Sequence, residues 1–191
     1  MPMANIARRW TLEEVEALPE DGNKYELIHG RLFVTSTPTN QHETILARLT
    51  RILDPYVAAQ GLGYIYHPRA VFRIGREVQV EPDLMVRLPH PGPDQTWETA
   101  PLPSLVVEVA SRSTRARDKT VKRAVYATEA RIPDYWMIDE RTRSVRVLRP
   151  DGIDVETNGL LEWSPAGASE PLVFDVARLF DEQRTATFKV L

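Results

Sequence analysis

The run Leu105-Val106-Val107-Glu108-Val109-Ala110 sets a single carboxylate among apolar residues. A continuous apolar run of this length, rich in β-branched side chains, predicts a strand that is buried on both faces. Burying an ionised glutamate in such a strand costs several kcal/mol unless a cation or hydrogen bonds compensate for the lost water. We therefore expect Glu108 to face a partner inside the protein.

Two kinds of partner suit Glu108. A buried Arg or Lys would pair with it and hold the core in register, which is the common role of an isolated buried acid. Alternatively, Glu108 shares a divalent metal with a second acid, and Asp83 in Val80-Glu81-Pro82-Asp83, about 25 residues upstream, is the candidate. Pro82 lacks an N–H and indicates a strand edge, bulge or start, so Asp83 is expected where a strand ends or bends. We favour convergence of Asp83 and Glu108 on a metal, with Lys122 beside them.

The segment after this strand predicts a helix that runs to about Ala130. In it Asp118, Lys122 and Tyr126 recur at intervals of four and therefore line one face. Asp118 and Lys122 could form a surface ion pair of little energetic weight. The helix directly follows the Glu108 strand, however, so its first turns can lie beside the end of that strand.

Upstream of these residues, the chain begins with a capping box. Thr11-Leu12-Glu13-Glu14 predicts a short helix to about Leu18, and Tyr25–Ile28 and Arg31–Val34 predict a hairpin around His29-Gly30. Glu26 is the acid of this hairpin. A longer helix follows Thr39, and Pro55 is expected to kink it or to start a second segment. His42, in the first turn of this helix, is either an auxiliary site residue or a solvated helix-start histidine.

Residues 64–86 predict a meander of strands, and residues 88–103 predict a surface loop in which Trp97 packs onto the core. Further strands are expected at 134–139 and 144–148, with Trp136 in the core and Asp139 at a turn. Later Asp-Gly and Asn-Gly turns predict a small antiparallel extension.

Composition limits the possible classes of protein. The chain has 191 residues, which suits a single domain over residues 1–191. No apolar run approaches the length of a membrane span, and the first ten residues lack the apolar core of a signal peptide. With no cysteine and a net charge of −3, the plain expectation is a cytoplasmic protein without strong nonspecific affinity for nucleic acid.

Two carboxylates on adjacent strands make an oxygen-rich site for Mg²⁺, a hard cation that keeps several waters. Such an ion can activate water and neutralise charge on a phosphodiester, and a nearby lysine can orient or deprotonate the attacking water. Glycosidases also use two carboxylates, but they need an open sugar cleft, and nothing in the sequence marks one. The pattern therefore favours phosphodiester hydrolysis.

These motifs, taken in order, resemble the Uma-type endonuclease family, a bacterial branch of the PD-(D/E)XK, restriction-endonuclease-like superfamily. The likeness spans about residues 11–180. The segments that carry it are Tyr25-Glu26-Leu27-Ile28-His29-Gly30-Arg31-Leu32, Glu81-Pro82-Asp83-Leu84, the Glu108 strand through Ser111, then Asp118, Lys122 and Tyr126, and Ile132-Pro133-Asp134-Tyr135-Trp136-Met137-Ile138-Asp139.

The resemblance implies an α+β fold, with a restriction-endonuclease-like mixed sheet flanked by helices, and Mg²⁺- or Mn²⁺-dependent cleavage of DNA. It makes Asp83 and Glu108 the acidic metal ligands, with the Val109 carbonyl as a further contact. The superfamily lysine is replaced by Ala110, and Lys122 on the following helix matches its role. Glu26 matches a recurrent glutamate, as an auxiliary ligand or as a hairpin residue paired with an arginine. A homodimer is common in such folds, although no sequence feature fixes an interface.

A cluster of basic residues could face DNA phosphates, or could simply be a solvated helix face. Its members are Arg112, Arg115, Arg117, Lys119, Lys122, Arg123 and Arg131. Two other functions stay open at this point. One is a catalytically inactive nuclease-fold module that binds nucleic acid or a protein partner; the other is a nonenzymatic oligomer with an ion-paired core.

Overall fold

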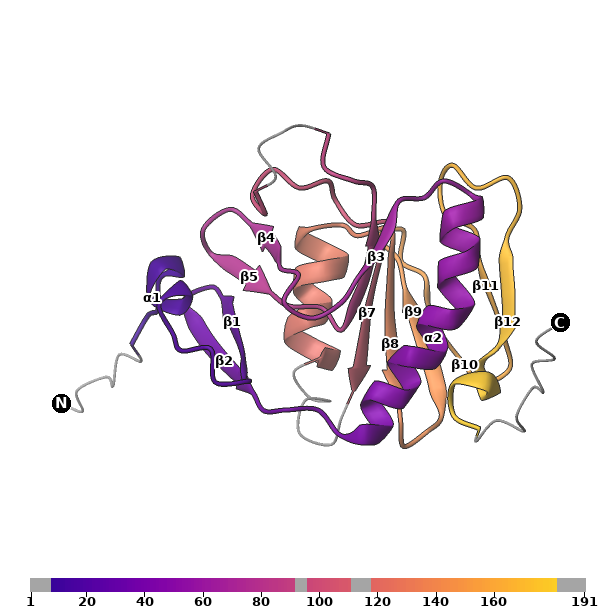
Figure 1. Ribbon diagram of the computed structural model, residues 1–191, viewed down its shortest axis with the longest axis horizontal. Helices are drawn as coiled ribbons and strands as arrows, with labels where there is room; N and C mark the ends of the chain where they lie inside the picture. The colour runs from indigo at the N-terminus through magenta and orange to yellow at the C-terminus, as the bar shows by residue number, and fades with distance from the viewer. Residues whose placement is uncertain (1–7, 92–95, 111–117, 182–191) are drawn as a thin grey trace, which may run out of the picture.

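The structure is a computed structural model that describes residues 8–91, 96–110 and 118–181, apart from the side chains of residues 118 and 119. It is a mixed α+β protein with a six-stranded sheet, a four-stranded sheet and a separate two-stranded hairpin (Figure 1). In the described part of the chain, no helix is long and apolar enough to cross a bilayer.

The six-stranded sheet has the strand order β10-β9-β8-β7-β6-β3. Strands β7 and β8 are parallel, and the other neighbouring pairs are antiparallel, so the sheet is mixed, as predicted. In chain order its strands are β3 (Tyr64–Tyr66), β6 (Leu84–Arg87), β7 (Leu105–Ala110), β8 (Asp134–Asp139), β9 (Ser144–Leu148) and β10 (Asp154–Thr157). Every residue of β7 is buried, which confirms the reading of the Glu108 run.

The four-stranded sheet has the order β2-β1-β5-β4. Its strands are β1 (Lys24–Ile28), β2 (Arg31–Thr35), β4 (Phe72–Ile74) and β5 (Val78–Val80). The predicted hairpin is confirmed: His29 and Gly30 both have positive φ, of 51° and 76°, which a tight two-residue turn between twisted strands requires.

The prediction of one continuous meander over residues 64–86 is wrong. Strands β4 and β5 join the sheet of the hairpin, whereas β3 and β6 join the larger sheet. The chain changes sheets at Glu81-Pro82-Asp83, between β5 and β6. Pro82 has no N–H to continue a ladder, so the crossing falls at the residue where strand pairing is weakest.

Two α-helices precede most of the strands. The first, α1 (Leu12–Glu16), begins with the predicted capping box between Thr11 and Glu14. The second, α2 (Asn40–Ala59), is continuous, so the expected second segment at Pro55 is wrong. Leu53 and Val57 are buried on either side of the proline, and this packing holds the helix together despite one lost backbone hydrogen bond.

The helix expected after β7 is π-helical, in the segments η1 (Asp118–Lys122) and η2 (Ala124–Glu129). The Ala130 N–H donates to the Val125 carbonyl at 2.9 Å, a five-residue spacing. π-Helical turns are rare in proteins, and those that occur are often found at functional sites. Lys122 and Tyr126 still lie on one face, because both side chains reach Glu108.

The two faces of β7 contribute to different cores. Leu105, Val107 and Val109 pack with α2 residues on one side, while Val106 and Ala110 pack on the other with Val125 and Tyr126 of the π-helical segment. The sheet is thus covered on both faces, by α2 and by the π-helical segment with the smaller sheet (Figure 1). Glu108 alternates with the α2-facing residues and therefore points into the second core.

The chain closes with β11 (Leu160–Trp163), β12 (Leu172–Asp175) and the 3-10 helix η3 (Val176–Leu179). The predicted extension is wrong in its connections: the Asp-Gly turn joins β9 to β10 inside the six-stranded sheet, and the Asn-Gly turn joins β10 to β11, which pairs with β12 instead. Trp136 is 1 % exposed and contacts Trp163 of β11, so both indoles belong to the core. Trp97 packs against the second core, as predicted.

Candidate active site

Asp83 lies at the start of β6, directly opposite Glu108. The antiparallel register pairs Leu84 with Val107, so Asp83 and Glu108 follow as the next opposed positions. The Asp83 carboxylate is 4 % exposed, and its Oδ2 accepts a hydrogen bond from the Val109 N–H at 2.8 Å. The two acids are therefore joined through the peptide that connects Glu108 to Val109.

Cations surround the Asp83 carboxylate. The Lys24 ammonium, from β1, forms an ion pair with Oδ1. The His42 Nε2, from the first turn of α2, lies 3.4 Å from Oδ2. The structure thus brings His42, a predicted auxiliary site residue, to Asp83. The first turn of α2 is fixed there because the Thr39 hydroxyl accepts from the His42 N–H at 3.2 Å.

Glu108 is paired with a lysine, as the simplest reading of a buried acid expects. The Lys122 Nζ donates to Glu108 Oε1 at 2.6 Å, and the Tyr126 hydroxyl donates to the same oxygen at 2.9 Å. Lys122 is 1 % exposed. The structure therefore brings together the predicted triad of Asp83, Glu108 and Lys122, although a lysine on Glu108 suits a structural pair as well as a catalytic one.

Glu26 completes the cluster from the smaller sheet. Its Oε1 lies 2.9 Å from the Lys122 Nζ and accepts a hydrogen bond from the Glu81 N–H at 3.0 Å. Among the described residues, the cation that pairs with Glu26 is the buried Lys122. Glu26 thus links the hairpin, the crossing at Pro82 and the π-helical segment.

Burial and charge shift several ionisation equilibria here. Burial raises the pKa of Asp83, but the Lys24 ammonium and the His42 hydrogen bond outweigh it, so the pKa lies below its usual value. Burial lowers the pKa of His42, yet the Asp83 carboxylate leaves it raised overall. Burial and the nearby Glu108 charge hold the pKa of Tyr126 well above its usual value. Tyr126 therefore stays protonated and acts as a hydrogen-bond donor.

The sequence reading missed Lys24. It stands two residues before Glu26 on β1, and alternation along a strand places both side chains on one face. This was the available signal. The side chain is only 17 % exposed, so its charge is largely removed from water and depends on Asp83 for compensation.

A cavity of about 200 Å³ opens beside this cluster. Lys24, His42 and Glu81 line it together with residues of the turn after β2 and of the Pro68-Arg69 segment. Glu81 is 7 % exposed, and burial raises the pKa of its carboxyl group. The cavity connects the surroundings of Asp83 with the solvent.

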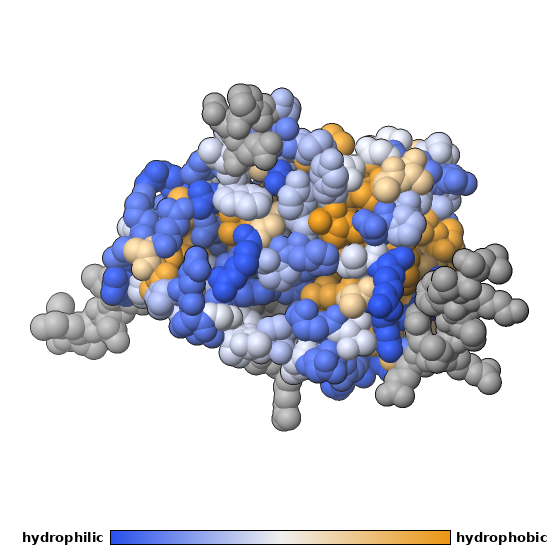
Figure 2. Space-filling model, viewed as in Figure 1, coloured by the Kyte–Doolittle hydropathy of each residue, from blue (hydrophilic) through white to orange (hydrophobic). Residues whose placement is uncertain are grey.

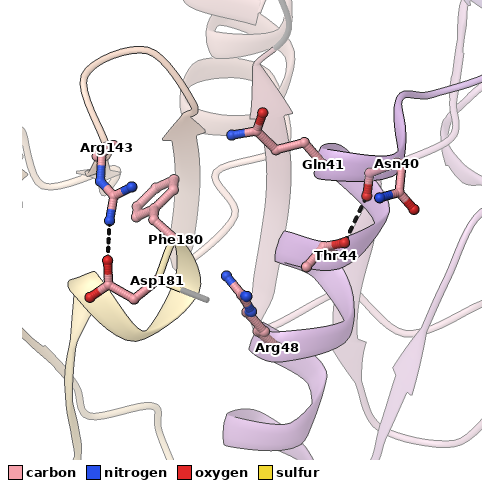
Figure 3. Close-up of a pocket in the computed structure, with 7 residues that line it drawn as sticks. All are labelled: Asn40, Gln41, Thr44, Arg48, Arg143, Phe180 and Asp181. Atoms are coloured by element: carbon pink, nitrogen blue, oxygen red, sulfur yellow. Dashed lines mark hydrogen bonds and ion pairs between the residues drawn. The ribbon is translucent and has the colours of Figure 1, made fainter. Parts of the chain in front are cut away.

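A second cavity, of about 480 Å³, lies on the other side of the first turn of α2 (Figure 3). Arg48 and Arg143 both line it, together with Asn40, Gln41, Thr44, Phe180 and Asp181. Arg143 is ion-paired with Asp181, and Arg48 donates to the Leu179 carbonyl at 3.1 Å. The first turn of α2 therefore separates an acid cluster from a groove that carries two guanidinium groups.

Some predicted residues lie outside the described part of the chain. They are the basic residues Arg112, Arg115 and Arg117, and the side chains of Asp118 and Lys119. The predicted part played by the Val109 carbonyl stays a prediction, since the contact of Val109 within the cluster is made by its N–H.

The oxygen donors around Asp83 and Glu108 bear on whether the site can hold a divalent ion. Among the described residues, no group of three or more His, Cys, Asp or Glu side chains is arranged to hold a metal. Asp83 and Glu108 are nevertheless neighbouring oxygen donors, and Lys24 and His42, the two partners of Asp83, line the adjacent cavity. Such a pair suits Mg²⁺, an ion that binds one or two carboxylates and keeps several waters. Two neighbouring carboxylates are ligands of the kind that Mg²⁺ binds. In the structure, the Lys24 ammonium is ion-paired with one of them, Asp83.

Comparisons with known proteins show the family and the fold of the chain. The family model Uma2, described as "Putative restriction endonuclease", matches residues 12–174. A crystal structure from Anabaena variabilis, described as that of a "putative nuclease", superposes with a TM-score of 0.70 and 21 % sequence identity, covering 90 % of this chain and 97 % of that one. A search of curated proteins finds no match. The structural likeness shows a shared fold.

Proposed function

Because the chain belongs to the Uma2 family, described as "Putative restriction endonuclease", we propose that it is an endonuclease that hydrolyses phosphodiester bonds of DNA with Mg²⁺ or Mn²⁺. The observation that carries this proposal is the Asp83 carboxylate held by the Val109 N–H, next to Glu108 on the neighbouring strand. Two acids are thereby fixed side by side before any ligand arrives, which is the preorganisation that a metal-dependent nuclease needs.

In this proposal Asp83 and Glu108 hold the ion, with waters filling its remaining positions. When bound, the ion would supply an activated water and neutralise charge on the phosphodiester. Asp83 is suited to this task, because its lowered pKa keeps it ionised at neutral pH. The Val109 N–H orients the carboxylate and limits its rotation.

Lys122 and Tyr126 act on Glu108 in the same proposal. Both donate to Glu108 Oε1 and so fix the rotamer of that carboxylate. Lys122 also neutralises Glu26, and the cluster therefore does not accumulate uncompensated negative charge around the substrate phosphate. Its ammonium can in addition orient the attacking water, the role that lysine has in the related superfamily pattern.

The groove on the other side of the first turn of α2 suits the flanking DNA backbone. Arg48 points into it from α2, and Arg143 faces it from the turn after β8 (Figure 3). Guanidinium groups are the usual donors to phosphate oxygens. The net charge of −3 makes such a local basic surface necessary, because the whole protein does not attract DNA.

The test is cleavage of a supercoiled plasmid in the presence of Mg²⁺ or Mn²⁺. Asp83→Asn should lower the rate by at least about a hundredfold, since loss of a metal ligand removes several kcal/mol of transition-state stabilisation. Asp134→Asn is the matched control, because Asp134 is also 4 % exposed but pairs with Arg149, away from the cluster. Metal-dependent cleavage that persists in a Glu108→Ala, Lys122→Ala double variant would count against the proposal.

A second candidate function is an inactive nuclease-fold module that binds nucleic acid or a protein partner. The observation in its favour is that both acids are already neutralised, Asp83 by Lys24 and Glu108 by Lys122. Binding of a DNA fragment in a gel-shift assay, with no cleavage at any Mg²⁺ or Mn²⁺ concentration, would favour this candidate. Turnover that is lost in Asp83→Asn would exclude it.

A further inference from the structure

The Lys24 ammonium stands inside a group of acids. It forms an ion pair with Asp83 Oδ1, and its Nζ lies 3.4 Å from the Glu81 carbonyl oxygen. Burial lowers the pKa of Lys24, but the charges of Asp83 and then Glu108 more than restore it, so the net shift is upward. The Lys24 ammonium is therefore the cation in direct contact with Asp83, one of the two carboxylates that the proposed metal would bind.

The Lys24 ammonium beside the two carboxylates has the same electrostatic effect as a bound cation. It offsets their mutual repulsion and the cost of burying them. This ammonium would repel a divalent ion placed near the same carboxylates. Two like charges a few ångströms apart in a partly buried site repel each other by several kcal/mol. The two cations cannot both occupy the position beside Asp83 Oδ1.

We propose that Lys24 is the placeholder cation of the metal centre, and that a divalent ion binds by displacing its ammonium from Asp83. This inference rests on the proposed function. It assigns to Lys24 a direct influence on metal affinity, a role that the sequence motifs do not indicate.

The structure offers the displaced ammonium a place to go. Lys24 and Glu81 line the same cavity, and Glu81 Oε2 is buried without a hydrogen-bond partner in the described part of the structure. An unsatisfied buried carboxylate oxygen is costly, so it is a favourable acceptor for a lysine that leaves Asp83. The flexible four-carbon stem of lysine permits this movement without a change of the strand.

The first test is the affinity of the full chain for Mn²⁺, measured by isothermal titration calorimetry without DNA. Lys24→Met removes the competing charge and keeps the length of the side chain, so the affinity should rise at least about tenfold. Arg31→Met is the matched control: it removes one exposed positive charge from the same hairpin and should leave the affinity within about twofold of the parent. Unchanged or weaker binding by Lys24→Met would overturn the inference.

A second measurement uses the unaltered protein and so does not depend on the folding of a variant. The ¹⁵Nζ resonance of Lys24, observed by NMR, should move when Mg²⁺ is added, because the ammonium leaves Asp83. A resonance that does not move at saturating Mg²⁺ in the parent protein overturns the inference.

The two proposals can fail separately. If plasmid cleavage needs metal and Asp83 but Lys24→Met leaves Mn²⁺ affinity unchanged, the placeholder role alone is wrong. If neither the parent nor Lys24→Met binds Mn²⁺, both the metal-dependent nuclease and the placeholder are wrong.

Discussion

The two faces of the six-stranded sheet are equally dry but chemically different. On the face that packs against α2, most buried side chains are hydrocarbon or indole, such as Val107 and Trp136, and the buried acid Asp134 accepts a hydrogen bond from the Trp163 indole. On the other face, Glu108 and Lys122 are buried as deeply, at 3 % and 1 % exposure. One sheet therefore carries an apolar core on one side and a network of ions on the other, while hydrophilic residues cover much of the outer surface seen in Figure 2.

This difference separates the interactions that stabilise the fold from the charged side chains that the fold positions for function. Apolar burial against α2 is favourable in proportion to the area removed from water. Buried ions lose hydration that their pairing only partly repays, so the ionic face contributes little net stability. We infer that apolar burial, against α2 and around Val106 on the second face, supplies the free energy of folding, and that the buried ions are retained for the chemistry of Asp83 and Glu108.

The largest expected loss of stability comes from removing a cation from the buried ion network. Lys122→Met leaves Glu26 and Glu108 buried without their shared cation, which should lower the free energy of unfolding by about 3–5 kcal/mol. Urea unfolding at pH 7 measures this. Arg123→Met, at the next position but paired on the surface with Asp154, should change stability by less than about 1 kcal/mol. Equal losses in the two variants would contradict the contrast between the buried and the exposed pair.

A cavity on the apolar face should cost somewhat less. Leu49 is fully buried on α2, and Leu49→Ala should lower the free energy of unfolding by about 2–5 kcal/mol. Because Leu49 belongs to the apolar core rather than to the ion cluster, the Mn²⁺ affinity of the folded protein should not change. Thermal unfolding and calorimetry report the two quantities separately; a large loss of affinity would show that the two faces are coupled.

The acid limb of the stability curve distinguishes two equally buried aspartates. The pKa of Asp83 is lowered, so its stabilising contribution is present above the unfolded value of about 3.9 and is lost as pH falls through the folded pKa. Burial raises the pKa of Asp134 despite Arg149, so its contribution is present below about 3.9 and is lost as pH rises through the folded pKa.

The expected outcome is therefore opposite in sign for the two substitutions. Asp83→Asn should flatten the loss of stability on acidification, and Asp134→Asn should steepen it. Urea unfolding of the parent and both variants at a series of pH values from about 6 to about 3 provides the comparison. Parallel curves for the two variants would show that the charge around Asp83 does not differ from that around Asp134.

The smallest effect is expected at the sheet edge. Asp154 on β10 pairs with Arg146 and Arg123 at the surface, and these charges remain hydrated. Asp154→Asn should change the free energy of unfolding by less than about 1 kcal/mol, and less still at high salt. A loss comparable to that of Lys122→Met would mean that burial is not what gives the ionic face its sensitivity.

Local signals in the sequence predicted a good part of this fold. The capping box at Thr11, the turn at His29-Gly30 and the buried β7 strand were all confirmed, because each depends on neighbours within a few residues. The split of residues 64–86 between two sheets was not predicted, since strand pairing is decided by distant partners. The π-helical form of residues 118–129 carried no recognisable local pattern either.

By itself the sequence determined that Glu108 is buried in a strand and needs a cation, because an apolar run cannot hold an unpaired charge. It also determined that Lys122 and Tyr126 share a helical face. Only the tertiary structure decided that Lys24 reaches Asp83, because that pair joins two sheets whose packing no short-range pattern encodes. The amino-acid sequence determines which charged side chains the protein has, and the packing of the two sheets determines which of them come into contact.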